Sequence, residues 1–255
     1  MKCQKILQRM EEIAPKNLAE EWDNPGLLIG NFNCDVKKIL VCLDVDCRAI
    51  DAAVENEIDL IIAHHPIIFR SMKNLRTDLP LGSRIEKLLS HGISVFAAHT
   101  NLDSAEGGVN DVLAEKLGLT EVKSLEDSFG RIGKLSEKIS ARDFAEFVKK
   151  VLNADHVRLV ESNSKLISKI AVCGGAGAEF IDKAKFHGAD LFVTSDVKYH
   201  EAQHAFEIGL NVIDAGHFYT EFPIVHVIAE KLRESFESEI EILEDAGSGN
   251  FFEIV

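Results

Sequence analysis

The sequence predicts an α/β fold of two similar domains, each a mainly parallel sheet flanked by helices. Three observations predict this fold. The 255 residues are 46% hydrophobic and 27% charged, as is typical of a globular protein with a sizeable core. Apolar, β-branched runs alternate with segments of helical periodicity. The second half of the chain then repeats the order of the first half, which indicates an internal repeat.

In the first half, strand-like and helix-like segments alternate regularly. A helix and the short strand "GLLIG" come first, and three further strands are separated by helices. The later strands are predicted at 37–45 and 58–66, and a further strand with the loop that follows it is predicted at 93–103. The helices are predicted at 2–13, 47–57, 83–92 and 109–118.

The second half contains matching segments in the same order. "KIAVCGG" (169–175) echoes "KILVCLD" (38–44), and "DLFVTSD" echoes "DLIIAHH" at the same offset. "LNVIDAGH" (210–217) echoes "ISVFAAHT" (93–100), "VHVIAEKL" echoes "VNDVLAEKL", and a helix at 140–152 precedes the strand "HVRLV". We therefore expect domains at 1–126 and 127–255, with the C-terminal segment packing back on the first and a site in the cleft between them.

Composition excludes several classes of function. The net charge of −14 argues against nucleic acid as a partner, because phosphate binding needs clustered lysine and arginine. No apolar run reaches the ~18–20 residues that a membrane span needs. The N-terminal segment is amphipathic and lacks the apolar core of a signal peptide, so we expect a cytoplasmic protein. The five cysteines are odd in number and show no CxxC spacing, which indicates reduced thiols.

The stretch "DLIIAHHPIIF" (59–69) is the clearest functional signal. His64 and His65 interrupt an apolar run at the end of a predicted strand, just before Pro66. Ligands in parallel sheets bind beyond the carboxyl ends of the strands, so both imidazoles are candidate metal ligands. A hydrogen-bonded structural pair is about equally compatible with the pattern.

Other strand ends supply further candidate ligands. Asp103 follows His99 by four residues in a predicted loop, and "DAGHFYTE" places Glu221 four residues after His217. If a helix has begun by His217, this spacing puts His217 and Glu221 on one face of it. Pro223, however, suits the first turn of a helix that begins later, in which case His217 lies in the loop before it.

Five candidate ligands are more than one tetrahedral zinc ion can bind. His64, His65, Asp103, His217 and Glu221 suit two divalent ions separated by ~3.5–4 Å, and imidazole with carboxylate selects zinc, iron or manganese. His99, Asp196 and His200 are candidates for a supporting role or for contact with substrate.

Three other patterns have competing explanations. "HEAQH" (200–204) matches a zinc-protease motif, but no protease scaffold surrounds it. The glycines of "CGGAGAEF" (173–180) are expected to serve turn geometry rather than anion binding. Arg70, Lys73 and Arg76 are expected to lie in a solvated loop rather than on phosphates, and Trp22 to lie in the core or at the rim of the site.

Together, "EEWDNPGLLIG", "AHHPIIF", "HTNLDSAEGGVND", "SDVKYHEAQ" and "DAGHFYTE" resemble the NIF-three-like dinuclear metal family, also labelled GTP cyclohydrolase type 2 homologue. The resemblance covers essentially the whole chain and implies metal ligation at the same five residues. It also implies ring-shaped hexamers. Ser195 departs from the family pattern, in which a glycine usually precedes Asp196.

From these observations we expect a metal-dependent hydrolase with a small-molecule substrate. The family label implies GTP, with water attacking guanine C8 and formate being released. A non-catalytic protein for metal binding or delivery is the main alternative, and a phosphoesterase is another. In the delivery alternative the same five ligands would store or hand over an ion. Storage needs only the ligands, whereas catalysis also needs an open coordination position and a substrate pocket.

Overall fold

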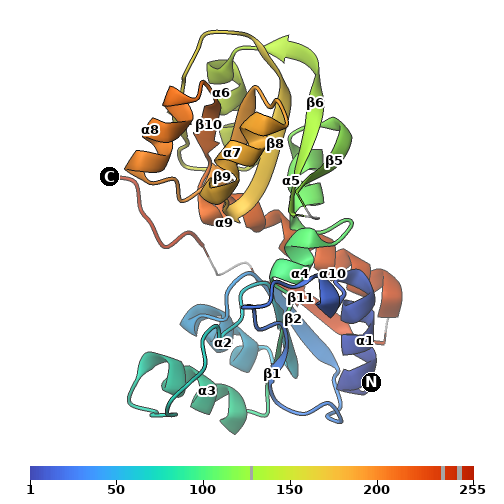
Figure 1. Ribbon diagram of the computed structural model, residues 1–255. Coiled ribbons are helices and arrows are strands. Elements are labelled where there is room, and N and C mark those ends of the chain that lie inside the picture. The colour runs from blue at the N-terminus through green and yellow to red at the C-terminus, as the bar shows by residue number, and fades with distance from the viewer. Residues whose placement is uncertain (127–128, 237–238, 246–248) are drawn as a thin grey trace. The chain divides into compact units, whose positions relative to one another are not determined.

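The computed structural model describes residues 1–126, 129–236, 239–245 and 249–255, and these residues form two compact units (Figure 1). The first unit comprises Met1–Glu106 and Ile224–Gly249. The second unit comprises Gly107–Pro223 and Asn250–Val255. The chain therefore leaves the first unit and returns to it near its C-terminal end.

The sheet of the first unit is parallel except at one edge. Its order is β1-β4-β3-β2-β11, and β1 pairs antiparallel with β4 while the other neighbours are parallel. The strands are β1 (Gly26–Ile29), β2 (Lys38–Cys42), β3 (Leu60–Ala63), β4 (Ser94–Ala97) and β11 (Glu241–Glu244). The carboxyl ends of β2, β3 and β4 consequently meet at one edge, where the predicted ligands begin.

Helices cover both faces of this sheet. On one face, α2 (Cys47–Glu55) and α3 (Pro80–Ser90) share an apolar core with alternate strand residues such as Leu40 and Ile61. On the other face, Met10 of α1 (Cys3–Ile13) and Ile228 of α10 (Pro223–Phe236) lie beside Val41 and Ile62. The short helices η1 (Lys16–Leu18) and α4 (Thr100–Ser104) complete the unit.

The second unit has a mixed sheet in the order β5-β6-β8-β9-β10-β7. Its central strands β8, β9 and β10 are parallel, and β5, β6 and β7 pair antiparallel with their neighbours. The strands are β5 (Thr120–Glu126), β6 (Phe129–Ile139), β7 (Arg158–Val160), β8 (Ile167–Ala176), β9 (Leu191–Ser195) and β10 (Asn211–Asp214).

Two separate apolar cores flank the second sheet, because successive strand residues point to opposite faces. Ile170 and Val172 face α5 (Val109–Lys116) and α6 (Ala141–Val151). Ala171 and Cys173 face the other side, with α7 and α8. The remaining helices are η2 (Ala178–Phe180), α7 (Ile181–Phe186), α8 (Tyr199–Glu207) and α9 (His217–Glu221). Among the described residues, no helix has the length and apolar character needed to cross a membrane.

The two units share one topology, which confirms the predicted fold class of two similar α/β domains. The order β1-β4-β3-β2, with its antiparallel edge, recurs as β7-β10-β9-β8. Helix α1 precedes the first set of four strands, and helix α6 precedes the second set. The last helices of the repeats are exchanged, because α5 follows the first set but belongs to the second unit, whereas α10 follows the second set and belongs to the first unit.

The predicted domain boundary between residues 126 and 127 differs from the division in the structure. Residue 126 ends β5, which pairs with β6 inside the second unit, and residue 127 lies outside the described residues. The first crossing between the units comes earlier, after Glu106. The sequence pattern did not reveal this because α5 has the same apolar periodicity whichever sheet it covers. The C-terminal β11 pairs with β2 of the first unit.

The exchanged helix α10 gives a test of the fold. Ile228 is 2% exposed and contacts the sheet of the first unit, so Ile228→Ala should lower the free energy of unfolding by about 2–5 kcal/mol, through lost burial and the cavity left behind. Urea denaturation would measure this loss. Leu89→Ala, at a 54% exposed position of α3, is the control and should change stability by less than about 0.5 kcal/mol. Equal effects for the two variants would contradict the placement of α10.

Candidate metal centre

His64 and His65 lie directly beyond the last residue of β3. Their backbone N–H groups continue the sheet by donating to Cys42 O and Leu43 O, at 3.2 and 2.9 Å. These bonds fix the backbone of both histidines at the carboxyl edge of the sheet, as their position before Pro66 predicted.

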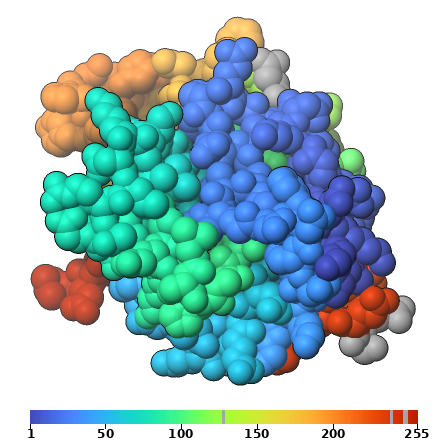
Figure 2. Space-filling model, turned by 90° about the horizontal axis from the view of Figure 1, so that it is seen from below, coloured from blue at the N-terminus to red at the C-terminus, as the bar shows by residue number. Residues whose placement is uncertain are grey.

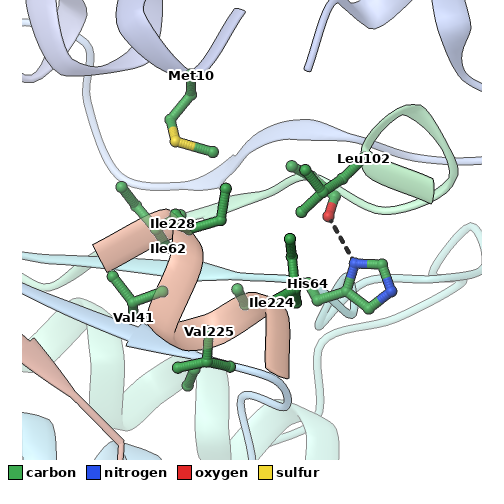
Figure 3. Close-up of a pocket in the computed structure, with 11 residues that line it drawn as sticks. Met10, Val41, Ile62, His64, Leu102, Ile224, Val225 and Ile228 are labelled. Atoms are coloured by element: carbon green, nitrogen blue, oxygen red, sulfur yellow. Dashed lines mark hydrogen bonds between the residues drawn. The ribbon is translucent and has the colours of Figure 1, made fainter. Parts of the chain in front are cut away.

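The His64 ring is held by a backbone carbonyl. Its Nδ1 lies 2.9 Å from Ala98 O, and the ring is at the edge of a group of apolar side chains (Figure 3). A carbonyl oxygen can only accept a hydrogen bond, so Nδ1 carries the proton. In the neutral ring the lone pair then resides on Nε2, the form in which imidazole binds metal ions.

Carboxylates hold His65 and His99 in the same way. His65 Nδ1 lies 2.9 Å from Asp44 Oδ1, and His99 Nδ1 lies 2.8 Å from Asp23 Oδ1. An ionised carboxylate can only accept, so both rings carry a proton on Nδ1. Three histidines from two strand ends therefore share one tautomer.

Asp23 is ionised and fully enclosed. Its side chain is 0% exposed, and it accepts hydrogen bonds from the backbone N–H and the hydroxyl of Thr100 as well as from His99. Burial alone would raise the pKa of Asp23, but the hydrogen bonds from His99 and Thr100 outweigh it and hold the pKa well below its ordinary value. The carboxylate therefore stays charged and keeps the His99 ring in place.

The candidate ligand atoms of the first unit converge. One nitrogen from each of His64, His65 and His99 lies within 4.8 Å of the others. Asp103 Oδ1 lies 3.6 Å from His64 Nε2, and Asp103 is 6% exposed. It lies in the short helix α4 rather than in the predicted loop, because Thr100 N–H bonds Asp23 and so starts a helical turn there.

In the second unit, His217 and Glu221 lie at the two ends of α9, so the helical alternative for their spacing is the correct one. His217 Nδ1 lies 2.6 Å from Asp196 Oδ2, which again places a proton on Nδ1. Asp196 has a positive φ of 55°, a conformation that aspartate tolerates better than most residues. It lies just beyond the end of β9 and orients His217 from there.

The contact between His217 and Glu221 requires a positive charge. His217 Nε2 lies 3.1 Å from Glu221 Oε2, and Glu221 is 4% exposed. With Nδ1 donating to Asp196, a neutral ring would direct a lone pair at a carboxylate oxygen. A second proton on the ring or a metal ion between the two atoms makes the contact attractive. The pair is therefore a candidate position for a cation, with a protonated ring as the alternative.

Glycine at position 175 makes room for the Glu221 carboxylate. A Cβ at Gly175 would lie 2.1 Å from Glu221 Oε1, and the residue has a φ of +64°. Its N–H donates to Thr220 Oγ1 at 3.0 Å, which ties the end of β8 to α9. Gly175, near the carboxyl end of β8, therefore leaves the space that the Glu221 carboxylate occupies.

Comparison with known proteins gives one family across nearly the whole chain. The model of Duf34/NIF3 (NGG1p interacting factor 3) matches residues 1–246. The chain belongs to the DUF34/NIF3 family. A relative from Clostridium perfringens named "GTP cyclohydrolase 1 type 2 homolog" is 36% identical over 262 residues and 100% of both chains. A relative of the same name from Lactococcus lactis is 35% identical over 99% of both chains.

Solved structures agree with this assignment. The Bacillus cereus protein related to NIF3 has a TM-score of 0.95 and 27% identity, with 100% of this chain and 99% of that one covered. Reduced HcgD from Methanocaldococcus jannaschii has a TM-score of 0.85 and 31% identity, with 96% of this chain and 97% of that one covered. The DUF34/NIF3 fold is thus the fold of this chain.

The other sequence candidates lie elsewhere in this DUF34/NIF3 protein. His200 is exposed on α8, where its Nδ1 lies 3.4 Å from Gln203 Oε1. In the "HEAQH" segment, Glu201 accepts the N–H of Lys198 as a helix cap. His204 Nε2 lies 2.7 Å from Asp182 Oδ1. These contacts explain the segment as part of a helix and its cap.

Sequence reasoning missed the residues that orient the ligands. Asp44 and Asp23 were given no role, and Gly175 was assigned only to a turn. The signal for Asp44 was available, since an acid directly beyond the end of β2 lies at the same sheet edge as His65. The partnership between Asp23 and His99 spans 76 residues and depends on β1 pairing with β4, which no local pattern reveals.

The glycine at position 175 gives a prediction with a matched control. Gly175→Ala should destabilise the protein by more than the about 1–3 kcal/mol that the positive φ alone costs, because the methyl group also displaces the Glu221 carboxylate. Gly92→Ala has a φ of +70° with nothing within 4 Å, so it carries only the backbone cost. Thermal unfolding of both variants would compare them, and equal losses would contradict the described packing of Glu221.

The carboxylate of Asp44 gives a second prediction. Asp44→Ala removes the acceptor that orients His65, so it should weaken divalent-metal affinity by about 10–100-fold while leaving the fold intact. Calorimetric titration with zinc would measure the change. Asp51→Ala, which removes an exposed carboxylate paired with Lys87, is the control. Unchanged zinc affinity in Asp44→Ala would show that His65 does not bind the metal.

Proposed function

We propose that this protein binds two divalent metal ions through His64, His65, Asp103, His217 and Glu221 and uses them for hydrolysis. One observation carries the proposal: four imidazoles, those of His64, His65, His99 and His217, all direct Nδ1 at an oxygen acceptor. A single histidine with this contact is common in protein structures. His91, His200 and His226 also have Nδ1 near an oxygen acceptor, but all three are exposed. The four rings named above are buried or half-buried, and each lies near a carboxylate or another imidazole nitrogen, as the ligands of a metal centre do.

The donor set fits a borderline divalent ion. Imidazole nitrogen with carboxylate oxygen favours zinc, iron or manganese over calcium, which prefers an all-oxygen shell. The second unit offers His217 and Glu221, and two ligands are too few to retain an ion in competition with water. We therefore propose that both units contribute to the same pair of ions.

The proposed reaction is hydrolysis of a small molecule. When bound, the ions would supply Lewis acidity and a water of lowered pKa. The chain's own part is orientation: Asp23, Asp44 and Asp196 hold the imidazoles, and the buried carboxylates of Asp103 and Glu221 supply negative charge that retains the cations. Because the ligands are oriented beforehand, little reorganisation accompanies metal binding.

The names of the relatives suggest GTP as the substrate. One water would add to guanine C8 and open the five-membered ring, and a second would release the C8 atom as formate. Non-catalytic metal storage or delivery is the second candidate, because it needs only the oriented ligands. A phosphoesterase is distinguished from both by release of phosphate instead of formate.

Metal content of matched variants tests the shared centre. Elemental analysis of purified wild-type protein loaded with zinc or manganese should give two ions per chain. His64→Ala in the first unit and Glu221→Ala in the second should each lower the content of both ions. The double variant should lose little more than either single variant, because the sites are coupled. His91→Ala, at an exposed histidine, should have no effect. Strictly additive, independent losses would indicate two unconnected sites.

Formate release distinguishes the two functions. Metal-loaded wild-type protein incubated with GTP should release formate, and His64→Ala should release at least 100-fold less. If neither protein releases formate or phosphate while wild-type protein exchanges its metal reversibly, the delivery function is correct and the hydrolase proposal is wrong.

A further inference from the structure

Two exposed aromatic side chains lie against the histidines of the first unit. Trp22 is 60% exposed and Phe69 is 44% exposed, and their ring centroids lie 5.8 Å apart at an interplanar angle of 71°. Both contact His99, with centroid distances of 6.2 and 6.0 Å. His99 in turn lies 5.7 Å from His65. The two aromatic rings are thus one imidazole away from a proposed metal ligand.

The segment that carries Trp22 is held rigidly. The next residue, Asp23, is bound to His99 and Thr100, and the Asn24 side-chain amide donates to Ile68 O at 2.7 Å. The first set of contacts ties Trp22 to the end of β4, and the second ties it to the residue before Phe69. The backbone that carries the two exposed rings is therefore tied to the segments that carry the histidines.

The exposure of these two rings gives up burial free energy, which is consistent with a role in binding. Exposed indole and phenyl faces forgo the favourable burial of large apolar side chains, here on a segment that hydrogen bonds hold in place. Indole and phenyl faces bind flat rings by stacking, and alanine substitution at such platforms typically costs about 1–3 kcal/mol per base. The exposed cations Arg70 and Lys73 follow Phe69 by one and four residues, on the surface segment before α3 (teal in Figure 2).

We propose that Trp22 and Phe69 form the binding platform for a planar heteroaromatic ring, such as a purine base, and so determine the substrate class of the neighbouring centre. The inference deepens the proposed function and rests on it for the reaction. The binding of the ring, however, depends only on the first unit. The platform selects the ring, and the exposed cation Arg70, next to Phe69 in the sequence, is available to an anionic substituent.

Fluorescence offers a direct test, because Trp22 is the only tryptophan in the chain. Guanosine, which has the ring but no phosphate, should quench this emission saturably when titrated into the full-length protein. Ribose 5-phosphate, which has the phosphate but no base, should not. The titration is performed on metal-free and on zinc-loaded protein, with metal content measured on the same samples.

Variants separate stacking from a merely structural role. Calorimetry should show that Trp22→Leu weakens guanosine binding at least tenfold, whereas Trp22→Phe retains it within about threefold because a ring remains. Phe206→Leu removes a similarly exposed aromatic ring, 55% exposed on α8 in the second unit, and should leave binding unchanged. Unfolding temperatures of all three variants should match that of wild type, since these side chains are exposed.

The outcomes distinguish this inference from the proposed function. Ring binding by a protein that holds no metal would support the platform and count against the hydrolase. If the protein binds two metal ions but guanosine does not quench Trp22 saturably in the metal-free or the zinc-loaded state, the platform is wrong and the proposed metal centre is unaffected. If Trp22→Leu changes the oligomeric mass in solution and leaves guanosine binding intact, the aromatic pair is an interface between copies of the chain and the inference is wrong.

Discussion

The candidate site depends on hydrogen bonds between histidine Nδ1 atoms and oxygen acceptors. Each bond fixes a ring plane and, because the acceptor has no proton to give, fixes the tautomer too. The acceptors are the Ala98 carbonyl for His64 and carboxylates for the other three rings. Without them, each imidazole would populate both tautomers and rotate about its side-chain bonds. Ligand geometry then would have to be organised at the moment of metal binding, at a cost in affinity.

The internal repeat explains where these groups come from. β3 and β9 begin 131 residues apart, at positions 60 and 191, and the same offset relates His65 to Asp196. A strand end that carries a metal-ligand candidate in one unit therefore carries an orienting carboxylate in the other. α4 and α9 are likewise equivalent, starting at 100 and 217 directly after equivalent strands. One framework thus supplies a different set of candidate ligands in each unit.

The sequence predicted the parts of this protein that depend on local patterns. Strand β3 ends before His64 as Pro66 suggested, and the repeat order was readable because apolar strands and helix periodicities recur in register. The unit boundaries were not predictable, since the apolar faces of α5 and α10 fit either sheet equally well. The pairing of Asp23 with His99 and the space beside Gly175 also escaped prediction. Both depend on segments distant in sequence meeting at close range, which composition and periodicity do not encode.

The tautomers of the four histidines test the central claim most directly. Long-range nitrogen–proton correlation spectra of the metal-free protein, labelled at histidine with nitrogen-15, distinguish a proton on Nδ1 from one on Nε2. The account predicts that His64, His65 and His99 carry it on Nδ1 and that His217 carries a proton there whether or not Nε2 is also protonated. Zinc addition should then shift the Nε2 resonances of His64, His65 and His217 in particular. Mobile rings with mixed tautomers, or Nε2 resonances that zinc leaves unchanged, would contradict it.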